Sequence, residues 1–161
     1  TSWAAKGTVL IRQGGCETRE LIVLDGNAIS QITDSDGRSV CVGFHCGPGF
    51  VTPHVARTRD MTSLVSVEIT ADATIAEMDA SVLEATMLRS GDIRDWANAV
   101  LRQELARKTE REWCLAALGG RERLAWFREH YPNHEAVFAH GSIASFLGMT
   151  PVTLSRLRRG G

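Results

Sequence analysis

The feature that most constrains the fold of this chain is a long stretch without helix breakers, residues 90–118. It contains no proline, and its only glycine, Gly91, lies at its start. Apolar residues recur within it at helical spacing, and Ser90 is a favourable N-cap with Asp92 in the first turn. We expect one helix that ends at Gly119, where a left-handed residue is allowed. Because this length exceeds the usual globular range, we favour a helix paired with its copy over one folded back on its own sheet.

The residues before this helix have the composition of β-strands. Glycine-containing turns separate segments rich in β-branched and apolar residues, and the Asp36-Gly37 pair between two alternating runs predicts a hairpin. Pro48 and Pro53 exclude residues 47–60 from a central strand, so we expect a loop or short helix there. The spacing predicts a small barrel or sandwich. The expected strands are GTVLIRQ (7–13), RELIVLDG (19–26), AISQITDSDGRSVCVGFHC (28–46) and TSLVSVEIT (62–70).

Charge is distributed unevenly along the chain, although the formal net charge is −1. Residues 1–88 hold six Lys or Arg against eleven Asp or Glu, whereas residues 89–161 hold twelve against eight. A basic C-terminal part is suited to a polyanionic partner. No apolar run has the length of a membrane span, and no secretory signal is visible. Four cysteines form no disulfide framework at this length, so we expect reduced thiols and a cytoplasmic protein.

Clustered cysteines and histidines raise the question of a metal site. Cys41, His45, Cys46 and His54 lie close in sequence, but their spacing matches no established zinc pattern. We therefore expect no metal here, with buried thiols and surface histidines instead. A cupin-like metal enzyme with His45 and His54 as ligands is an alternative, but it leaves the C-terminal helices unexplained. The four tryptophans are expected to anchor packing: Trp3, Trp96, Trp113 and Trp126.

The segment SIASFLGMTPVTLSRLRR, residues 142–159, predicts two short helices joined by a tight turn. Ser142 can cap the first helix, and Gly148 supplies the positive φ of the turn. Thr150 can cap the second helix, with Pro151 at its first position. The inward-facing residues are expected to be Ile143, Leu147, Leu154 and Leu157, with the small Ala144 at the crossing. A preceding helix, residues 121–131, is expected to bury one side formed by Leu124, Ala125, Phe127 and Tyr131.

The outer face of the second helix has the composition of a DNA-reading surface. Val152, Ser155, Arg156 and Arg159 fall on one stripe, at positions i, i+3, i+4 and i+7. Short side chains let the backbone approach the major groove, and an arginine can donate two hydrogen bonds to guanine. Arg158 and Arg159 can hold phosphates. A packing hairpin with solvated arginines would show the same spacing, but the turn glycine and capped Thr-Pro start favour DNA binding.

These residues carry a resemblance to a known family. IASFLGMTPVTLSRLRR resembles the helix-turn-helix of CRP/FNR bacterial transcription regulators, and ARKTEREWCLAALGGRERLAWFREHYP resembles the segment that precedes it. KGTVLIRQG and DSDGRSVCVGFHCGPGF are similar to their cyclic-nucleotide-binding-like β-roll. The resemblance implies an α+β chain with an effector roll over residues 1–88, a dimerisation helix over 89–118 and a DNA-binding domain over 119–161. We expect the wing that follows the recognition helix in the family to be short or missing.

The resemblance also assigns residue roles. Arg156 matches the main base-reading arginine, and Ser155 matches a DNA-contacting position. Val152 stands where many members have glutamate, which accepts a hydrogen bond from cytosine N4. Valine cannot do so, but it can contact a thymine methyl. The expected DNA-contacting set is Thr150, Val152, Thr153, Ser155, Arg156 and Arg159.

The loop that grips cyclic nucleotides in the family is altered here. Thr52-Pro53 stands near the expected glutamate, and either Met61-Thr62 or Thr62-Ser63 stands where the arginine and its hydroxyl partner are expected. Arg57 and Arg59 are nearby but out of register. Losing a charge-assisted bond to the phosphate removes much of the affinity for a cyclic nucleotide. We therefore expect an unknown effector or none. The candidate effector pocket comprises Phe50, Thr52, His54, Thr62 and Ser63.

The sequence thus predicts a homodimeric transcription regulator that is not an enzyme. Its expected partners are a near-palindromic double-stranded DNA, a second copy through residues 89–118, and RNA polymerase, with no membrane and no cofactor. A scaffold that keeps the roll and helix but no longer binds DNA remains an alternative, because Val152 departs from the family pattern and the wing is expected to be short or missing.

Overall fold

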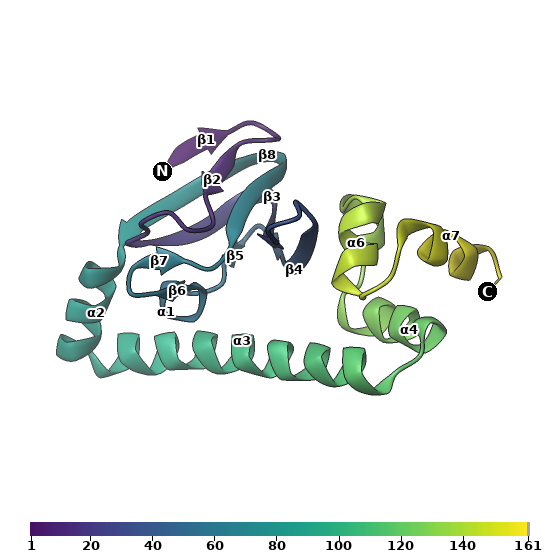
Figure 1. Ribbon diagram of the computed structural model, residues 1–161. Helices are drawn as coiled ribbons and strands as arrows, with labels where there is room; N and C mark the ends of the chain where they lie inside the picture. The colour runs from purple at the N-terminus through teal and green to yellow at the C-terminus, as the bar shows by residue number, and fades with distance from the viewer. Residues whose placement is uncertain (161) are drawn as a thin grey trace.

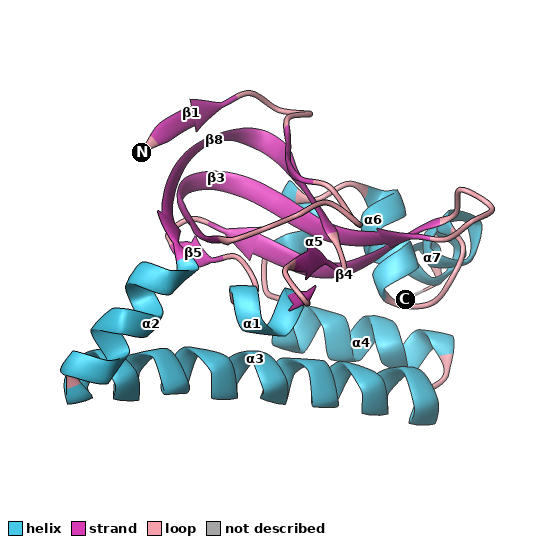
Figure 2. Ribbon diagram, turned by 60° about the vertical axis from the view of Figure 1, so that its left-hand side comes forward, coloured by secondary structure: helices cyan, strands magenta, loops and turns pink. Residues whose placement is uncertain are grey.

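The computed structural model describes residues 1–160 and combines an antiparallel sheet with helices. Six strands form the main sheet in the order β1-β8-β3-β4, with β2 paired to β8 and β5 paired to β3. A two-stranded ribbon, β6-β7, lies beside it (Figures 1 and 2). The strands are β1 (Ser2–Ala4), β2 (Val9–Ile11), β3 (Arg19–Thr33), β4 (Ser39–Cys46), β5 (Gly49–Phe50), β6 (Thr58–Arg59), β7 (Thr62–Ser63) and β8 (Ser66–Asp79).

Two of the expected strands are joined into one, because β3 continues through Gly26. The prediction that a strand ends there was wrong. Gly26 has a φ of 91°, and the register between β3 and β8 shifts on both sides of it. A Cβ atom at Gly26 would lie 2.3 Å from the carbonyl oxygen of Asp72. The glycine therefore allows a bulge that bends a continuous strand.

The last predicted strand also has different limits in the structure. Residues 62–63 belong to the short ribbon, whereas β8 begins at Ser66 and runs to Asp79. The hairpin at Asp36-Gly37 is confirmed, since it joins the antiparallel strands β3 and β4 and Gly37 has a φ of 80°. The expected short helix within residues 47–60 is α1 (His54–Arg57).

Helix α2 (Ala80–Arg89) leads into α3 (Gly91–Ala117), the long helix expected from the sequence. The Ser90 hydroxyl accepts a hydrogen bond from the Ile93 N–H at 3.4 Å, so the predicted N-cap is confirmed. The predicted left-handed ending is wrong. Leu118 is the C-cap with φ −99°, and Gly119, with φ −75°, caps the next helix instead. A change of direction in extended backbone replaces the glycine turn.

Four helices follow α3 in the described chain and lie together against its C-terminal part (Figure 1). Within α4, Trp126 is buried and Ala125 is exposed, so the predicted buried side was wrong at Ala125. Ser142 lies inside α6 rather than at its N-cap, which is Ala139. These helices are α4 (Gly120–His130), α5 (His134–Val137), α6 (His140–Phe146) and α7 (Pro151–Arg159).

Two hydrophobic cores hold the molecule together. The roll core lies inside the sheet and contains only aliphatic side chains, among them Leu21, Val23 and Ile75. The junction core joins β3 and β4 to α3 and to the C-terminal helices. Its buried members are Ile29, Cys41, Phe44, Cys114, Leu124, Trp126, Phe127, Phe138, Ile143, Ala144, Phe146, Leu147 and Leu154.

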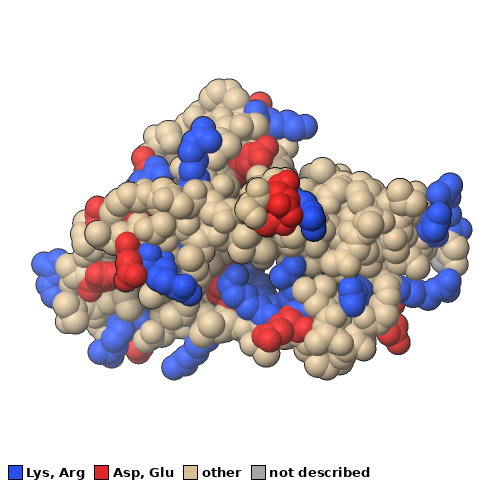
Figure 3. Space-filling view, in the orientation of Figure 1, with Lys and Arg blue, Asp and Glu red and all other residues tan. Residues whose placement is uncertain are grey.

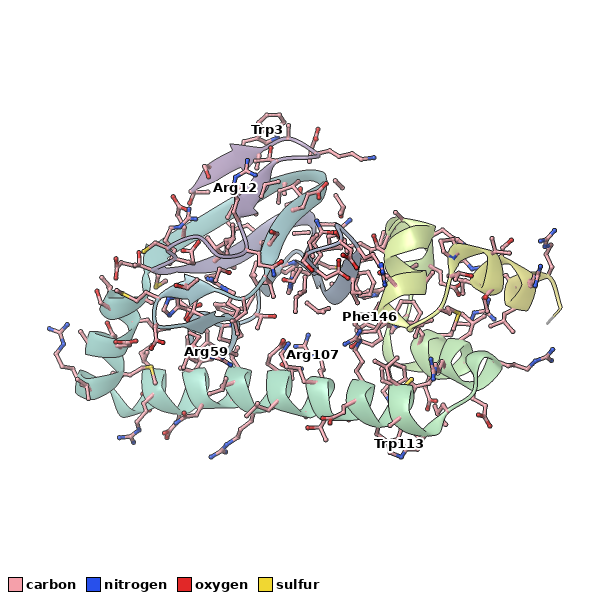
Figure 4. All side chains as sticks on the ribbon, in the orientation of Figure 1. Trp3, Arg12, Arg59, Arg107, Trp113 and Phe146 are labelled. Atoms are coloured by element: carbon pink, nitrogen blue, oxygen red, sulfur yellow. The ribbon has the colours of Figure 1, made fainter. Side chains whose placement is uncertain are left out.

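The tryptophans do not all serve as anchors within one chain. Only Trp126 is buried, whereas Trp3, Trp96 and Trp113 expose 68%, 42% and 56% of their surface. Trp113 points away from the roll, on the outer side of α3 (Figure 4). Among the described residues, no helix combines the length and apolar character needed to cross a membrane.

Candidate DNA-reading helix and roll cavity

The start of α7 is fixed by its own sequence. The Thr150 hydroxyl accepts a hydrogen bond from the Thr153 N–H at 3.1 Å, and Pro151 occupies the first turn. Both features satisfy or remove donors that a helix start leaves unpaired. Gly148 has a φ of 64°, the left-handed conformation expected for the turn between α6 and α7. The predicted cap, proline position and turn glycine are therefore confirmed.

The inner side of the α6–α7 hairpin is closely packed. Ile143, Ala144, Leu147 and Leu154 have no exposed surface, and Leu157 is partly buried against the same core. The Met149 N–H donates to the Ala144 carbonyl at 3.0 Å, which closes the turn. This packing leaves only one side of α7 available to a partner.

That available side carries most of the predicted DNA-contacting residues. Val152 exposes 60% of its surface, Thr153 and Arg156 are also exposed, and Ser155 is half-buried. Arg159 is exposed and donates to the Ser155 carbonyl of its own helix at 3.4 Å. The structure thus brings the predicted stripe together on one outward face, at the end of the molecule where basic side chains gather (Figure 3).

Arg158 has a different environment from the one the sequence suggested. Its Nε donates to the Glu135 carboxylate at 2.8 Å, and its Nη1 donates to the His140 Nδ1 at 2.7 Å. Nε2 of the same imidazole lies 3.0 Å from the Pro151 carbonyl, to which it donates. Arg158 therefore ties the end of α7 to α5 and α6 instead of extending toward phosphate.

The α6–α7 hairpin is docked on the roll through β4. Phe44 projects from β4 into the junction core, where its ring centroid lies 4.6 Å from that of Phe138 and 4.9 Å from that of Phe146. The Cys41 N–H, on the edge of the sheet, donates to the Ser145 hydroxyl of α6 at 3.0 Å. The edge strand is thereby covered by a helix, which also blocks pairing with another chain.

Two arginines reinforce this docking. The Arg111 guanidinium, from α3, lies 4.4 Å from the Phe146 ring centroid and donates to the Phe146 carbonyl at 3.1 Å. Arg123 donates to the Leu115 and Leu118 carbonyls at 2.9 Å each, and to the Leu147 carbonyl at 3.1 Å. Arg123 therefore satisfies open carbonyls at the end of α3 and links them to the turn of the hairpin.

A cavity of about 420 Å³ lies between the roll, α3 and the docked hairpin. Ser30 and His45 line it from the sheet, Arg57 from α1, Arg107 from α3, and Phe146 from α6. Figure 4 shows Arg107 rising from α3 toward the roll, and Figure 3 shows basic side chains gathered in a hollow above that helix. The wall thus combines apolar surface with several cations.

Buried polar groups give the cavity a defined electrostatic character. Arg57 is 1% exposed and donates to the Thr52 and Arg19 carbonyls, but its Nη1 has no partner among the described residues. Burial lowers the pKa of His45 to about 4, so its ring is neutral at pH 7, with Nε2 lying 2.7 Å from the Ser30 hydroxyl. Burial acts to raise the pKa of Glu104, but Lys108 and other donors hold it below its ordinary value.

Comparisons with known proteins agree on the architecture. The sequence matches no protein-family model and no curated protein. Solved structures match nearly the whole chain. FixK2 from Bradyrhizobium japonicum is 18% identical with a TM-score of 0.87, covering 99% of this chain and 82% of FixK2. A CooA mutant from Carboxydothermus hydrogenoformans is 17% identical with a TM-score of 0.79, covering 99% and 74%.

A third similar structure is that of a protein from a known family of regulators. TTHA1359 from Thermus thermophilus, a transcriptional regulator of the CRP/FNR family, is 19% identical with a TM-score of 0.72, covering 99% of this chain and 86% of that one. The chain has the fold of the CRP/FNR transcription regulators. Among these structures, TTHA1359 is a transcriptional regulator, which is not a class of enzyme.

Within this CRP/FNR fold, the five residues predicted as an effector pocket do not all line one cavity, although Phe50 and Thr52 together line one of about 350 Å³. Of the five, only Thr52 lines the 420 Å³ cavity, where its hydroxyl donates to Glu104 at 2.9 Å. Phe50 and His54 line a smaller cavity of about 260 Å³ between α1, α2 and α3. Ser63 is buried with its hydroxyl donating to the Val65 carbonyl, and Thr62 is exposed. Sequence spacing also missed the basic residues Arg107, Lys108 and Arg111.

The Cys and His residues considered for a metal site have separate environments. His45 is buried rather than on the surface, which corrects the expectation, and it bonds to Ser30. His54 Nε2 lies 2.8 Å from the Glu17 carbonyl, and the Cys46 sulfur lies 4.0 Å from His134. Within residues 1–160, no three such side chains converge as metal ligands. The cupin-like alternative gains no support from this arrangement.

Proposed function

We propose that this chain is a sequence-specific DNA-binding transcription regulator of the CRP/FNR type. The observation that carries the proposal is α7, a capped helix whose inner side is buried and whose outer side presents Val152, Ser155, Arg156 and Arg159. Such a helix can enter the major groove with its N-terminal turns near the bases. The CRP/FNR fold of the whole chain supports the same function.

We propose further that the chain acts as a homodimer through α3. At 27 residues this helix is about 40 Å long, longer than its own roll covers. Leu105 and Trp113, eight residues apart and so on similar sides of the helix, expose 53% and 56% of their surfaces. A second copy would bury these apolar groups and place two α7 helices about a two-fold axis, suited to a near-palindromic operator.

The DNA-binding proposal is tested by selecting bound sequences from a random duplex library with the full-length chain and no added ligand. We expect a two-fold symmetric motif with half-sites about one helical turn apart. The same selection with Arg156→Ala should lose or relax one position in each half-site. Only salt-sensitive binding without a recovered motif would contradict the proposal and favour a scaffold role.

The dimer proposal is tested by sedimentation equilibrium of Leu105→Lys. A charged side chain in an apolar interface is costly to bury, so we expect a shift toward monomer. The matched control is Val40→Lys, because Val40 is 41% exposed and apolar but lies on β4. If both variants and the unaltered chain had the same molecular mass in solution, α3 would not be the dimer interface.

We propose that cyclic AMP is not bound in the manner usual for the family. The Ser63 hydroxyl is used within the chain, Thr52 stands near the expected glutamate, and the Glu104 carboxylate faces the cavity. Two nitrogens of the buried Arg57 donate to backbone carbonyls, so this arginine is not arranged like the one that grips the cyclic phosphate in the family. Calorimetric titration with cyclic AMP should therefore show no binding in the micromolar range. A measured dissociation constant in the micromolar range would overturn the proposal that cyclic AMP is not bound in the usual manner.

A further inference from the structure

The first turn of α7 presents an apolar tip to its surroundings. Pro151 and Val152 have no polar side-chain atom, and both are exposed. The neighbouring Thr153 hydroxyl lies 3.0 Å from the Thr150 hydroxyl, so it is engaged in the helix cap. Side chains at this end of the helix are therefore suited to apolar contacts with a base and not to donating or accepting hydrogen bonds.

The next turn has the opposite character. Arg156 lies four residues after Val152, on the same side of the helix. It is exposed, and no described side-chain contact engages its guanidinium, whereas Arg158 is held by Glu135 and His140. A free guanidinium next to an apolar β-branched side chain gives two adjacent reading groups of different chemistry. The guanidinium of Arg156 fits the O6 and N7 acceptors of guanine, and the side chain of Val152 fits a methyl group.

The exposure of Val152 is itself unexplained within the chain. Neither hydrophobic core includes Val152, although it exposes 60% of a β-branched apolar side chain. Burying it in a complex would be favourable, and the C5 methyl of thymine is the apolar group that the major groove offers. The 5-methyl group of a modified cytosine occupies the corresponding place on that base.

We propose that Val152 is a specificity-determining residue that selects a pyrimidine bearing a 5-methyl group, thymine in unmodified DNA, beside the guanine contacted by Arg156. This inference rests on the proposed function and names the base chemistry that α7 reads. Each half-site then contains a hydrogen-bonded guanine and a neighbouring thymine recognised by its methyl group alone.

The test uses the duplex recovered by the selection above and replaces each thymine, one symmetric pair at a time, by deoxyuridine. This change removes only the methyl group. One buried methyl contributes roughly a fourfold change in affinity, so changing both half-sites should weaken binding roughly fifteenfold. The loss is expected at one symmetric pair next to the guanine and not at the other thymines.

Val152→Ala is the matched variant, because an exposed position leaves the fold unchanged, which circular dichroism can check. It should bind the thymine and deoxyuridine duplexes equally. With Val152→Glu, the preferred base at this position should become cytosine, since a carboxylate accepts a hydrogen bond from the N4 amino group. With the unaltered chain, 5-methylcytosine placed there should bind more tightly than cytosine.

The outcomes separate this inference from the function on which it rests. Failure to recover any symmetric motif would contradict the proposed function. A symmetric motif whose affinity is unchanged by every deoxyuridine pair, or an effect that persists in Val152→Ala, would overturn the role of Val152 while leaving sequence-specific DNA binding in place.

Discussion

The two hydrophobic cores differ in the type of side chain they contain and in how far apart in sequence their members lie. The roll core is aliphatic and is formed by β-strands with neighbours in the same sheet, as at Leu21 and Val23. The junction core contains five buried aromatic side chains and joins residues far apart in sequence, such as Phe44 of the roll and Phe138 and Phe146 of the C-terminal helices. The roll therefore has a core of its own, whereas the α6–α7 hairpin shares its core with the roll.

Removing the central ring of the junction should have the largest effect. Phe44→Ala should lower the free energy of unfolding by about 3–5 kcal/mol, because it leaves a cavity among five aromatic or imidazole rings. It should also weaken DNA binding by the folded protein, because the α6–α7 hairpin loses its packing contact with β4. Urea unfolding and a DNA titration measure the two effects.

Leu21→Ala in the roll core is the matched comparison. Leu21 is 1% exposed, so the change should cost about 2–5 kcal/mol of stability. DNA affinity per folded molecule should nevertheless stay near that of the unaltered chain. If both variants lost DNA affinity equally, or neither did, the two cores would not differ in the way described.

Protonation of His45 should give the next largest effect, and it acts on the cavity side of β4. Burial lowers its pKa to about 4 in the folded state, whereas the unfolded value is about 6.5. The unfolded chain therefore binds a proton first as the pH falls, and stability is lost between about pH 6.5 and pH 4, on the order of 3 kcal/mol in total. His45→Gln should show a flatter profile over this window in urea unfolding. An identical slope in both proteins would exclude His45 as the cause.

A smaller effect is expected from Arg111→Lys. Lysine keeps the charge but loses the planar group that stacks on Phe146 and reaches the Phe146 and Cys41 carbonyls. We expect a loss of about 1–2 kcal/mol in the free energy of unfolding. Arg102→Lys, on the exposed surface of the same helix, should change it by less than about 0.5 kcal/mol. Similar values for the two variants would show that Arg111 does not hold the junction.

The smallest effect is predicted at the outer edge of the helical group. The Glu135 carboxylate accepts hydrogen bonds from Arg128 at 2.6 Å and from Arg158 at 2.8 Å, and 26% of its side-chain surface is exposed. Because solvent screens such pairs, Glu135→Gln should cost only about 0.5 kcal/mol. The difference from the unaltered protein should shrink in 1 M salt, where the Debye length is about 3 Å. A cost that does not depend on salt would point to packing instead of charge.

Sequence patterns predicted the parts of the molecule that local chemistry determines. Thr150, Pro151 and Gly148 fix the start of α7 and its turn through bonds within a few residues. The length of α3 followed from the absence of prolines over residues 92–117. The outward stripe on α7 followed from helical periodicity alone.

Other features depend on contacts that no local pattern contains. The burial of Trp126 in place of Ala125 follows from the shared junction core. Gly26 resembles a strand end in the sequence, but close approach to Asp72 makes it a bulge. Arg57, an ordinary basic residue in the sequence, is buried and donates hydrogen bonds to the Thr52 and Arg19 carbonyls, of which Arg19 lies far from it in the sequence. The sequence therefore predicted the cavity lining only in part, whereas it predicted the start of α7 and the preceding turn well.

The most direct test of the account is the affinity of Arg156→Ala for the selected duplex and for a scrambled duplex at one fixed salt concentration. If Arg156 reads a base from the outer side of α7, the variant should lose about 1–3 kcal/mol on the selected duplex and almost nothing on the scrambled one. An equal loss on both duplexes would make Arg156 a phosphate contact and would contradict base reading by this face of α7.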